Sequence, residues 1–409
     1  MPNISASAYS HWQTCHRLYY WQHVIKLERT REEGARRFGT MYHAGLEAWW
    51  RAMDGGDVPW RDKDAALVQA INAISENAKH IDTDPFERAR AEAMMLAYHA
   101  RYFELDFESV GDARNSVEQW FSLPLLDPSG REIDGWRING KRDAIKRFAD
   151  GRVKPVEHKS TSWGIGPADD YWAAIAINTQ VSIYIDAAQR LGEHVDRVCY
   201  DVSRKPGAKP LLATPIEKRK MTKGKGCKLC GGRAGGKLGV AQGTGKVMKE
   251  VIKAGKKFEV EAACETCNGT GWEEAPALYD KQRVADESFV DFKMRLGDEI
   301  ASDPDSYFRM ADATRTEDQI LESRHDLYIA TGHIGAALSL AHGMPGGIAT
   351  VEARRCFERN TDACTNQYGR RCDYIDVCTG AVDPWSSPLY QIKKRSSKST
   401  QASLPGVSR

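Results

Sequence analysis

Residues 140–161 read GKRDAIKRFADGRVKPVEHKST, a pattern typical of two β-strands joined by a tight turn. If the turn takes the three residues 149–151, the strands pair in a register that sets Asp143 opposite Glu157. The register therefore predicts that two carboxylates converge from neighbouring strands.

Side chains alternate across a strand, so Glu157 and Lys159 should project from one face and His158 from the other. Carboxylate oxygens are preferred ligands of hard divalent cations, which can generate hydroxide and neutralise charge at phosphorus. Lys159 could orient the attacking water or stabilise that charge. The arrangement suits phosphodiester hydrolysis, although spacing alone favours a solvated cross-strand charge cluster.

Hydrophobic periodicity extends the pattern on both sides of this strand pair. We expect helices within residues 9–25, 38–49, 63–79, 85–105 and 169–190, and strands at 117–126, 133–148, 153–159 and 195–202. A capping box at Thr316 and Gln319 predicts one further helix, ending near His342. This order predicts an α/β fold with a small mixed sheet flanked by helices.

Composition divides the chain into four parts. Residues 1–204 carry the first helices and the core, 205–274 form an insertion rich in Gly and Lys, 275–385 return to helical patterning, and 386–409 resemble a basic disordered tail.

The overall composition is that of an ordinary globular protein, with 41% hydrophobic and 28% charged residues. No apolar run is long enough to span a membrane, and the N-terminus lacks the pattern of a secretory signal. We therefore expect no membrane partner and a cytoplasmic location. The net charge of +2 hides a local excess, because residues 218–257 contain many Lys and Arg and the single acid Glu250.

Two CxxC pairs lie within the insertion: Cys227 with Cys230, and Cys264 with Cys267. Glycines after each pair allow backbone amides to approach the sulfurs, and two such knuckles make a tetrahedral zinc site. The alternatives are a redox pair or unliganded thiols. We predict an inserted zinc ribbon that binds Zn²⁺, and its cations favour contact with DNA phosphates over a solvated loop.

Three sequence motifs occur in a fixed order along the chain. Residues 39–43 read GTMYH, residues 140–159 contain the pattern GxxD…ExK, and Gln180 and Tyr184 form a QxxxY pair on one helical face. Together they resemble the PD-(D/E)xK nuclease superfamily, in the branch of RecB-like, AddB-like, CRISPR-associated and phage iron–sulfur exonucleases.

The resemblance implies a restriction-endonuclease-like core that binds Mg²⁺ or Mn²⁺ through His43, Asp143, Glu157 and the carbonyl of His158. Lys159 would assist an activated water in line at phosphorus. Gln180 and Tyr184 would contact DNA and support the site. Taken singly, His43 also fits a satisfied helix histidine, and the QxxxY pair fits a surface polar residue beside a core tyrosine.

The same relatives hold a 4Fe-4S cluster with one N-terminal and three C-terminal cysteines. The resemblance implies that Cys15, Cys364, Cys372 and Cys378 form such a cluster and tie the chain ends together. Seven residues separate Cys364 from Cys372, a wider gap than the usual two, which leaves the cluster type open. The alternatives are a four-cysteine zinc site or buried thiols.

The resemblance implies a metal-dependent DNA exonuclease acting on single strands or DNA ends in recombination, repair or replication. A phage origin and a helicase or recombination-protein partner fit the same relatives. Two rival interpretations remain: a non-catalytic DNA-binding recombination partner, and an RNA-processing nuclease.

Overall fold

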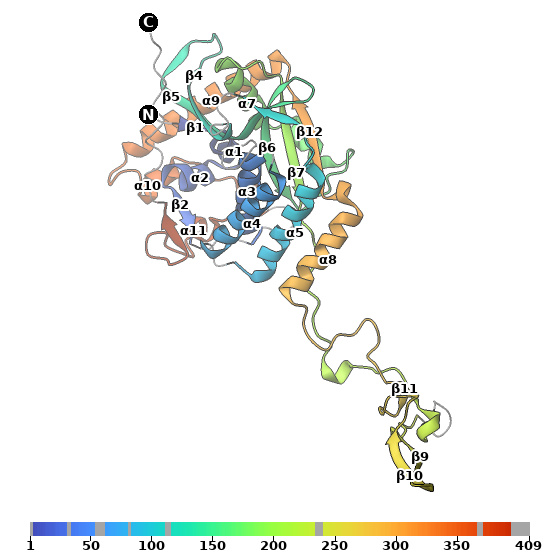
Figure 1. Ribbon diagram of the computed structural model, residues 1–409. Helices are drawn as coiled ribbons and strands as arrows, with labels where there is room; N and C mark the ends of the chain where they lie inside the picture. The colour runs from blue at the N-terminus through green and yellow to red at the C-terminus, as the bar shows by residue number, and fades with distance from the viewer. Residues whose placement is uncertain are drawn as a thin grey trace. The chain divides into compact units, whose positions relative to one another are not determined.

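The computed structural model describes residues 3–30, 34–53, 62–80, 83–110, 116–233, 240–365 and 371–393. The chain divides into two compact units, the first comprising Met1–Gly207 with Lys293–Arg409 and the second Ala208–Phe292 (Figure 1). Most of the predicted basic tail, residues 394–409, lies outside the described residues.

A mixed β-sheet forms the centre of the first unit (Figure 1). Seven described strands belong to it, in the order β1 (Asn3–Ile4), β5 (Glu132–Phe148), β6 (Val153–Thr161), β7 (Arg197–Arg204) and β12 (Phe308–Thr314), with β3 (Phe107–Ser109) and β4 (Val117–Leu126) also paired to β5. The β5–β6 and β7–β12 pairs are antiparallel, whereas β6 and β7 are parallel. A parallel pair needs a crossover, which here is helical.

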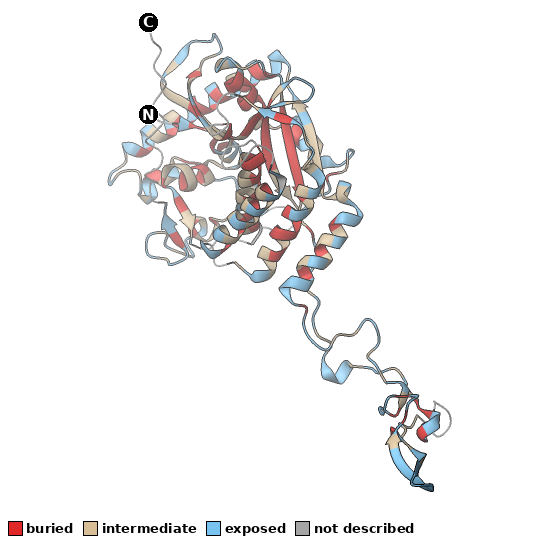
Figure 2. Cartoon of the chain, in the orientation of Figure 1, coloured by how far each residue is buried: buried red, intermediate tan, exposed pale blue. Residues whose placement is uncertain are grey.

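Helices cover both faces of this sheet. Helices α1 (Ala6–Thr14), α7 (Thr179–Arg190) and α9 (Glu317–His342) contribute to one hydrophobic core, and α3 (Gly34–Met53), α4 (Lys63–His80) and α5 (Pro85–Tyr102) contribute to the other. Successive residues of β7 alternate between the cores, since Val198 and Tyr200 belong to the first and Cys199 to the second. Figure 2 shows the central strands in red, the colour of buried residues. The predicted α/β fold with a mixed sheet flanked by helices is therefore confirmed.

The predicted turn between β5 and β6 is also confirmed. The Phe148 amide donates to the Arg152 carbonyl at 3.0 Å, and the Gly151 amide donates to the Phe148 carbonyl at 2.8 Å. Gly151 has a φ of 76°, a left-handed conformation that glycine adopts without a steric penalty. This turn sets the register of the two strands.

The predicted helix over residues 169–190 is wrong in one respect, because the structure divides it. Helix α6 (Asp170–Ala176) ends before Asn178, whose side chain accepts a hydrogen bond from the Gln180 amide at 2.8 Å and starts α7. An asparagine that caps a new helix competes with continuation of the preceding one. Helix α9 does begin with the predicted capping box of Thr316 and Gln319.

Segments from both ends of the chain lie side by side in the first unit. Strand β2 (Leu27–Arg29) pairs with β13 (Tyr390–Ile392), and the Arg17 guanidinium donates to the Phe357 carbonyl at 2.9 Å. Near them are α2 (His16–Tyr19), the π-helix η1 (Tyr20–Val24), α10 (Val351–Arg355), the 3₁₀ turn η6 (Thr361–Cys364) and α11 (Ile375–Thr379). Helix α8 (Phe289–Ser302) and the 3₁₀ turn η5 (Pro304–Ser306) precede β12 in the chain.

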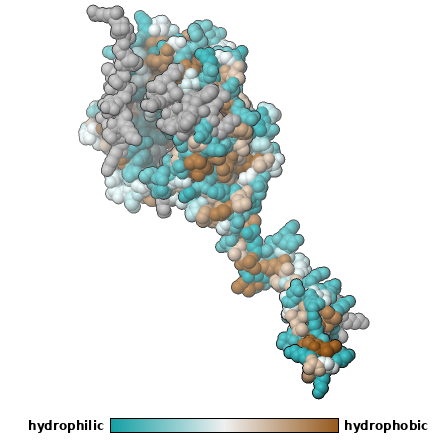
Figure 3. Space-filling model, in the orientation of Figure 1, coloured by the Kyte–Doolittle hydropathy of each residue, from teal (hydrophilic) through white to brown (hydrophobic). Residues whose placement is uncertain are grey.

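The second unit contains two small antiparallel strand pairs. Strand β9 (Lys246–Lys253) pairs with β10 (Lys256–Ala263), and β8 (Lys225–Gly226) pairs with β11 (Trp272–Glu274). The 3₁₀ turns η3 (Ile216–Lys218) and η4 (Lys228–Cys230) complete it. Its surface mixes hydrophilic and hydrophobic residues (Figure 3). In the described part of the whole chain, no helix combines the length and apolar character needed to cross a bilayer.

Candidate active site and metal centres

In the middle of β6, Glu157 and Lys159 lie on one face of the sheet and His158 lies on the other, as strand alternation predicts. The Lys159 ammonium forms an ion pair with the Glu157 carboxylate. The Gln180 amide nitrogen, on α7, donates to the same carboxylate at 2.8 Å. His158 points to the other face, where its ring packs 5.2 Å from that of Trp50 on α3. Glu157 and Lys159 therefore share the face covered by α7.

Asp143 joins this site through the backbone of β6. Pairing between β5 and β6 runs as far as Ala144 and Val156. Asp143 is the next residue of β5, and its carboxylate accepts a hydrogen bond from the His158 backbone amide of β6 at 2.8 Å. The Asp143 side chain, and not a backbone carbonyl, is therefore the acceptor for the His158 amide where the pairing of the two strands ends. The structure brings Asp143 next to Glu157, as the register predicts.

The Glu157 carboxyl group has a raised pKa. Burial, opposed by Lys159 and assisted by Asp143, raises the pKa of its carboxyl group. One of its oxygens, Oε1, is paired, whereas Oε2 is buried without a hydrogen-bond partner. A buried unpaired carboxylate oxygen costs free energy unless a cation or a proton meets it. The carboxylates of Asp143 and Glu157 therefore fit a hard divalent cation.

His43 approaches the same strand from α3. A Cβ built on Gly39 would lie 3.5 Å from Ser160 Oγ, so this turn of the helix packs closely on the end of β6. The His43 ring lies 6.4 Å from that of His158, measured between centroids. Burial, followed by the charges of His158 and Lys159, lowers the pKa of His43 to about 4. A neutral imidazole is the form that binds metals.

The ligand atoms of His43, Asp143 and Glu157 are not gathered closely around one point in this structure. Among the described residues, the one set of three or more His, Cys, Asp or Glu whose ligand atoms all lie within 4.8 Å of one another is a set of four cysteines in the second unit. His43, Asp143 and Glu157 do not form such a set.

A buried hydrogen-bond network behind the site was missed by sequence reasoning. His158 Nδ1 lies 2.8 Å from the Asp201 carboxylate on β7, which also accepts the Tyr98 hydroxyl at 2.7 Å. The Trp50 indole donates to that hydroxyl at 2.9 Å. Burial lowers the pKa of His158 and the Asp201 carboxylate raises it, with a net increase. The available signal was Asp201 itself, a carboxylate within the otherwise largely apolar strand segment VCYDV.

Gln180 and Tyr184 connect the site to β5. The Gln180 amide nitrogen lies 2.9 Å from the Tyr184 hydroxyl, which donates to the Lys141 carbonyl at 2.7 Å. Both side chains, together with Lys159, line a cavity of about 1430 Å³. The QxxxY pair is therefore built into the wall of a large opening at the acidic site.

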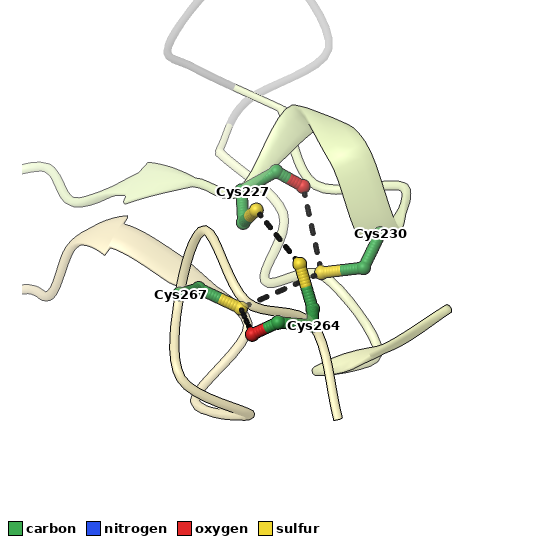
Figure 4. A group of neighbouring side chains, drawn as sticks. All are labelled: Cys227, Cys230, Cys264 and Cys267. Atoms are coloured by element: carbon green, nitrogen blue, oxygen red, sulfur yellow. Dashed lines mark hydrogen bonds between the residues drawn. The ribbon is translucent and has the colours of Figure 1, made fainter. Parts of the chain in front are cut away.

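The four cysteines of the second unit converge from two loops (Figure 4). The Sγ atoms of Cys227 and Cys264 are 3.8 Å apart, as are those of Cys230 and Cys267. Tetrahedral coordination with metal–sulfur bonds of about 2.3 Å places the sulfurs about 3.8 Å apart. The Gly271 amide also donates to Cys267 Sγ at 3.3 Å. This set could bind a metal ion, and its spacing fits a single tetrahedral one.

The second predicted cysteine set has a different geometry. Cys15, Cys364, Cys372 and Cys378 line one small cavity between the two ends of the chain. They are not among the ligand atoms that lie within 4.8 Å of one another. The Trp21 indole donates to Cys378 Sγ at 3.4 Å, and the Asn360 amide donates to Cys15 Sγ at 3.3 Å. The structure thus gathers these four cysteines at one small cavity, with their sulfurs farther apart than a single tetrahedral ion requires.

A family model described as "PD-(D/E)XK nuclease superfamily" matches residues 3–379, nearly the whole chain. No curated protein matches the sequence.

Proposed function

The chain belongs to the PD-(D/E)XK nuclease superfamily, and on that premise we propose that it is a metal-dependent deoxyribonuclease that degrades single-stranded DNA or DNA from its ends. The superfamily indicates a metal-dependent nuclease with a nucleic acid substrate. DNA as that substrate and exonucleolytic cleavage are the parts that we propose.

The observation that carries the proposal is the buried Glu157 carboxylate, which is paired with Lys159 through Oε1, lies near Asp143 and has no hydrogen-bond partner at Oε2. In our proposal Asp143, Glu157, the His158 carbonyl and His43 hold Mg²⁺ or Mn²⁺. The ion would supply an activated water and neutralise charge at phosphorus.

Each of the chain's own residues has a role in this scheme. Lys159 exchanges its ion pair with Glu157 for the water or the phosphate oxygens at the reacting phosphorus. Gln180 holds the Glu157 carboxylate in place at 2.8 Å, and Tyr184 anchors Gln180 to β5. The neutral His43 imidazole is ready to bind metal without first losing a proton.

We also propose a 4Fe-4S cluster on Cys15, Cys364, Cys372 and Cys378. A cluster is larger than a single ion, which agrees with four thiols that line a common cavity yet lie too far apart for one tetrahedral zinc. Its role would be structural, since the cysteines come from both chain ends. Iron and sulfide analysis, with absorption near about 400 nm from thiolate-to-iron charge transfer, tests this assignment. Zinc without iron would refute it.

For the second unit we propose a zinc ribbon that contacts DNA. The 3.8 Å separations of its sulfurs support zinc, and the β9–β10 hairpin supports DNA contact. One face of that hairpin carries Lys249, Lys253 and Lys256 beside the exposed Phe258, with no acidic residue of either strand on it. Cations beside an aromatic ring favour nucleic acid binding.

By the same resemblance, recombination, repair or replication is the proposed setting, with a helicase or recombination protein as a partner. A phage origin would agree with such a role.

The test uses end-labelled single-stranded DNA with Mg²⁺ or Mn²⁺. We expect the wild type to degrade it and Lys159→Ala to be slower by about 10²-fold or more, because the ammonium acts at the reacting phosphorus. Lys154→Ala is the matched control, since Lys154 lies on the same strand but pairs with Asp150 at 2.9 Å. Thermal denaturation of both variants checks that they are folded.

The outcomes separate the rival functions. Equal activity of wild type and Lys159→Ala, or no cleavage by either, would discredit the catalytic assignment and favour a DNA-binding recombination partner. Preference for a matched RNA strand would favour an RNA-processing nuclease. Blocking the 3′ or 5′ end in turn shows whether cleavage starts at an end.

A further inference from the structure

The cavity beside the acidic site is larger than a typical small-molecule site. Its volume is about 1430 Å³, whereas small-molecule sites occupy about 300–1,000 Å³. Lys159 and Gln180 stand in its wall, so whatever fills it reaches the proposed catalytic residues. An extended polymer is the occupant that this volume suits.

The side chains of the described cavity wall favour a polyanion, with Lys141 and Lys159 ion-paired to glutamates that lie outside the lining. Its described lining includes Lys26, Lys141 and Lys159 and contains no aspartate or glutamate. Serine, threonine, asparagine and glutamine side chains supply further hydrogen-bond donors around these lysines. Such a wall suits the phosphate oxygens of a nucleic acid strand without reading its bases.

The wall of this cavity also contains an exposed tryptophan. Trp120, on β4, is 72% exposed, compared with 51% for both Trp163 and Trp385. Single exposed apolar residues are common on protein surfaces. An exposed indole in the wall of a cationic cavity that reaches Lys159 is a more specific arrangement.

The position of Trp120 is set by contacts that lead to the acidic site. It pairs across the sheet with Lys141, whose ammonium lies 5.9 Å from the centroid of the indole ring. The same ammonium forms an ion pair with Glu118. The Lys141 carbonyl accepts the Tyr184 hydroxyl, which connects through Gln180 to Glu157. The cation–π contact places the indole against Lys141, and the hydrogen bonds join the backbone of Lys141 to the acidic site.

We propose that Trp120 is a stacking platform for an unpaired base of a single nucleic acid strand lying in this cavity. The inference rests on the proposed function and deepens it, because it assigns the preference for single strands to one residue. A base can stack on an indole only when it is free of its own duplex neighbours, and every base has such a face. The site would therefore select strandedness and tolerate any sequence.

The experiment measures binding separately from cleavage. Wild type, Trp120→Ala and Trp120→Phe are titrated with a fluorescein-labelled mixed-sequence DNA single strand, and with the corresponding hairpin-capped duplex, without added divalent metal. Trp385→Ala is the matched control, since Trp385 is also exposed but does not line the cavity. Initial rates with Mg²⁺ then give kcat and KM for the same single strand.

We expect Trp120→Ala to bind the single strand about 5- to 150-fold more weakly, the range that loss of one stacked base produces. Trp120→Phe should recover part of this loss, and Trp385→Ala should bind as wild type. The capped duplex should lose much less affinity than the single strand. In the kinetics, KM should rise more than kcat falls. Single-strand binding should also quench less tryptophan emission in Trp120→Phe than in wild type.

Three results would overturn the inference: unchanged single-strand affinity of Trp120→Ala, an equal loss for single strand and capped duplex, or no recovery by phenylalanine. Failure of the proposed function looks different. A wild type that binds single strands through Trp120 but cleaves none would leave this inference standing and remove the nuclease assignment.

Discussion

Gly140, the first residue of the GxxD motif, has a steric reason to be glycine. It pairs across the sheet with Phe121 of β4, and a Cβ added to it would lie 2.3 Å from Phe121 Cζ. The Phe121 ring in turn packs edge-on against Tyr184, with centroids 6.1 Å apart. Glycine at position 140 thus allows an aromatic ring to support the tyrosine of the QxxxY pair.

Replacing this glycine should therefore be costly. We expect Gly140→Ala to reduce the free energy of unfolding by about 1–3 kcal/mol, because the core must shift to accept the methyl group. Denaturant unfolding measures the change. Gly332→Ala in α9 is the control, since no atom lies within 4 Å of the added Cβ there. The same substitution in an open helical position should stabilise by about 0.5–1 kcal/mol. Equal effects of the two substitutions would contradict the packing argument.

A pair of histidines makes the N-terminal segment sensitive to acid. His11 Nδ1 lies 2.9 Å from His23 Nε2. Burial, followed by the charges of His11 and Lys26, lowers the pKa of His23 to about 4. Burial and then Arg36 also lower the pKa of His11. Both rings therefore stay neutral in the folded protein under conditions that protonate them in the unfolded chain.

The sign of the pH effect follows from this depression. The unfolded chain takes up a proton near pH 6.5 and the folded His23 only near pH 4, so the stability present above about 6.5 falls as the pH drops to about 4. We expect His23→Gln to decline less over this range, by about 1–3 kcal/mol. Thermal denaturation against pH measures the difference. His80→Gln, at an exposed helix end, should keep the wild-type profile. Parallel profiles for wild type and His23→Gln would show that His23 is not responsible.

At the scale of elements, the β5–β6 hairpin forms the acidic site through a local break in pairing. The two strands pair through Ala144 and Val156, and the Asp143 side chain then replaces a backbone acceptor at the His158 amide. The splayed strands leave room for Glu157 beside Asp143. The spacing between Asp143 and Glu157 therefore determines that the two residues lie opposite each other, because a three-residue turn at 149–151 sets the register of β5 and β6.

The β9–β10 hairpin presents two chemically different faces. Lys249, Lys253, Lys256 and Phe258 share one face. On the other face Lys246 pairs with Glu261 at 3.0 Å, and Lys257 pairs with Glu250 at 2.7 Å. The first face has cations in excess, whereas the second carries two lysines and three glutamates, Glu250, Glu259 and Glu261.

This difference gives a charge-matched test. We expect Lys253→Gln with Lys256→Gln to weaken DNA binding and to reduce the slope of log affinity against log salt by about 1–2, because up to two phosphate contacts are lost. The control is Lys246→Gln with Lys257→Gln, which removes the same charge from the opposite face. Affinity titrations over a range of salt concentrations measure both. Equal losses would indicate a general charge effect rather than a binding face.

At the scale of the whole molecule, the two units are stabilised in different ways. The first has two hydrophobic cores on either side of its sheet. Among the described residues of the second, the buried hydrophobic side chains are Phe292 and the four cysteines, with Val247 packed against the cysteines. Because this apolar core is so small, we expect the fold of the second unit to depend on a bound metal.

Metal removal should therefore affect the units unequally. We expect a zinc chelator to make Ala208–Phe292 sensitive to protease while the first unit stays resistant, as followed by limited proteolysis with mass spectrometry. Cys230→Ser should reproduce this sensitivity without chelator, which separates it from loss of other metals. Protease resistance of the second unit in zinc-free protein would contradict a metal-dependent fold.

Much of the fold could be predicted because local chemistry determines it. Alternation and turn residues located β4, β5 and β6, and the capping box located the start of α9. The CxxC spacing brought four sulfurs together in the second unit. The break between α6 and α7 was missed, because the periodicity of this stretch did not reveal that the Asn178 side chain would cap a new helix.

The sequence by itself determined the strand pair with Asp143, Glu157 and Lys159, since a short turn sets register without help from the rest of the chain. Only the tertiary structure decided that Asp201 holds His158, that Trp120 shares a cavity with Lys159, and that four distant thiols line one space. These residues meet through strand order and helix packing. Such contacts depend on how buried surfaces fit together, and residue spacing along the chain does not encode them.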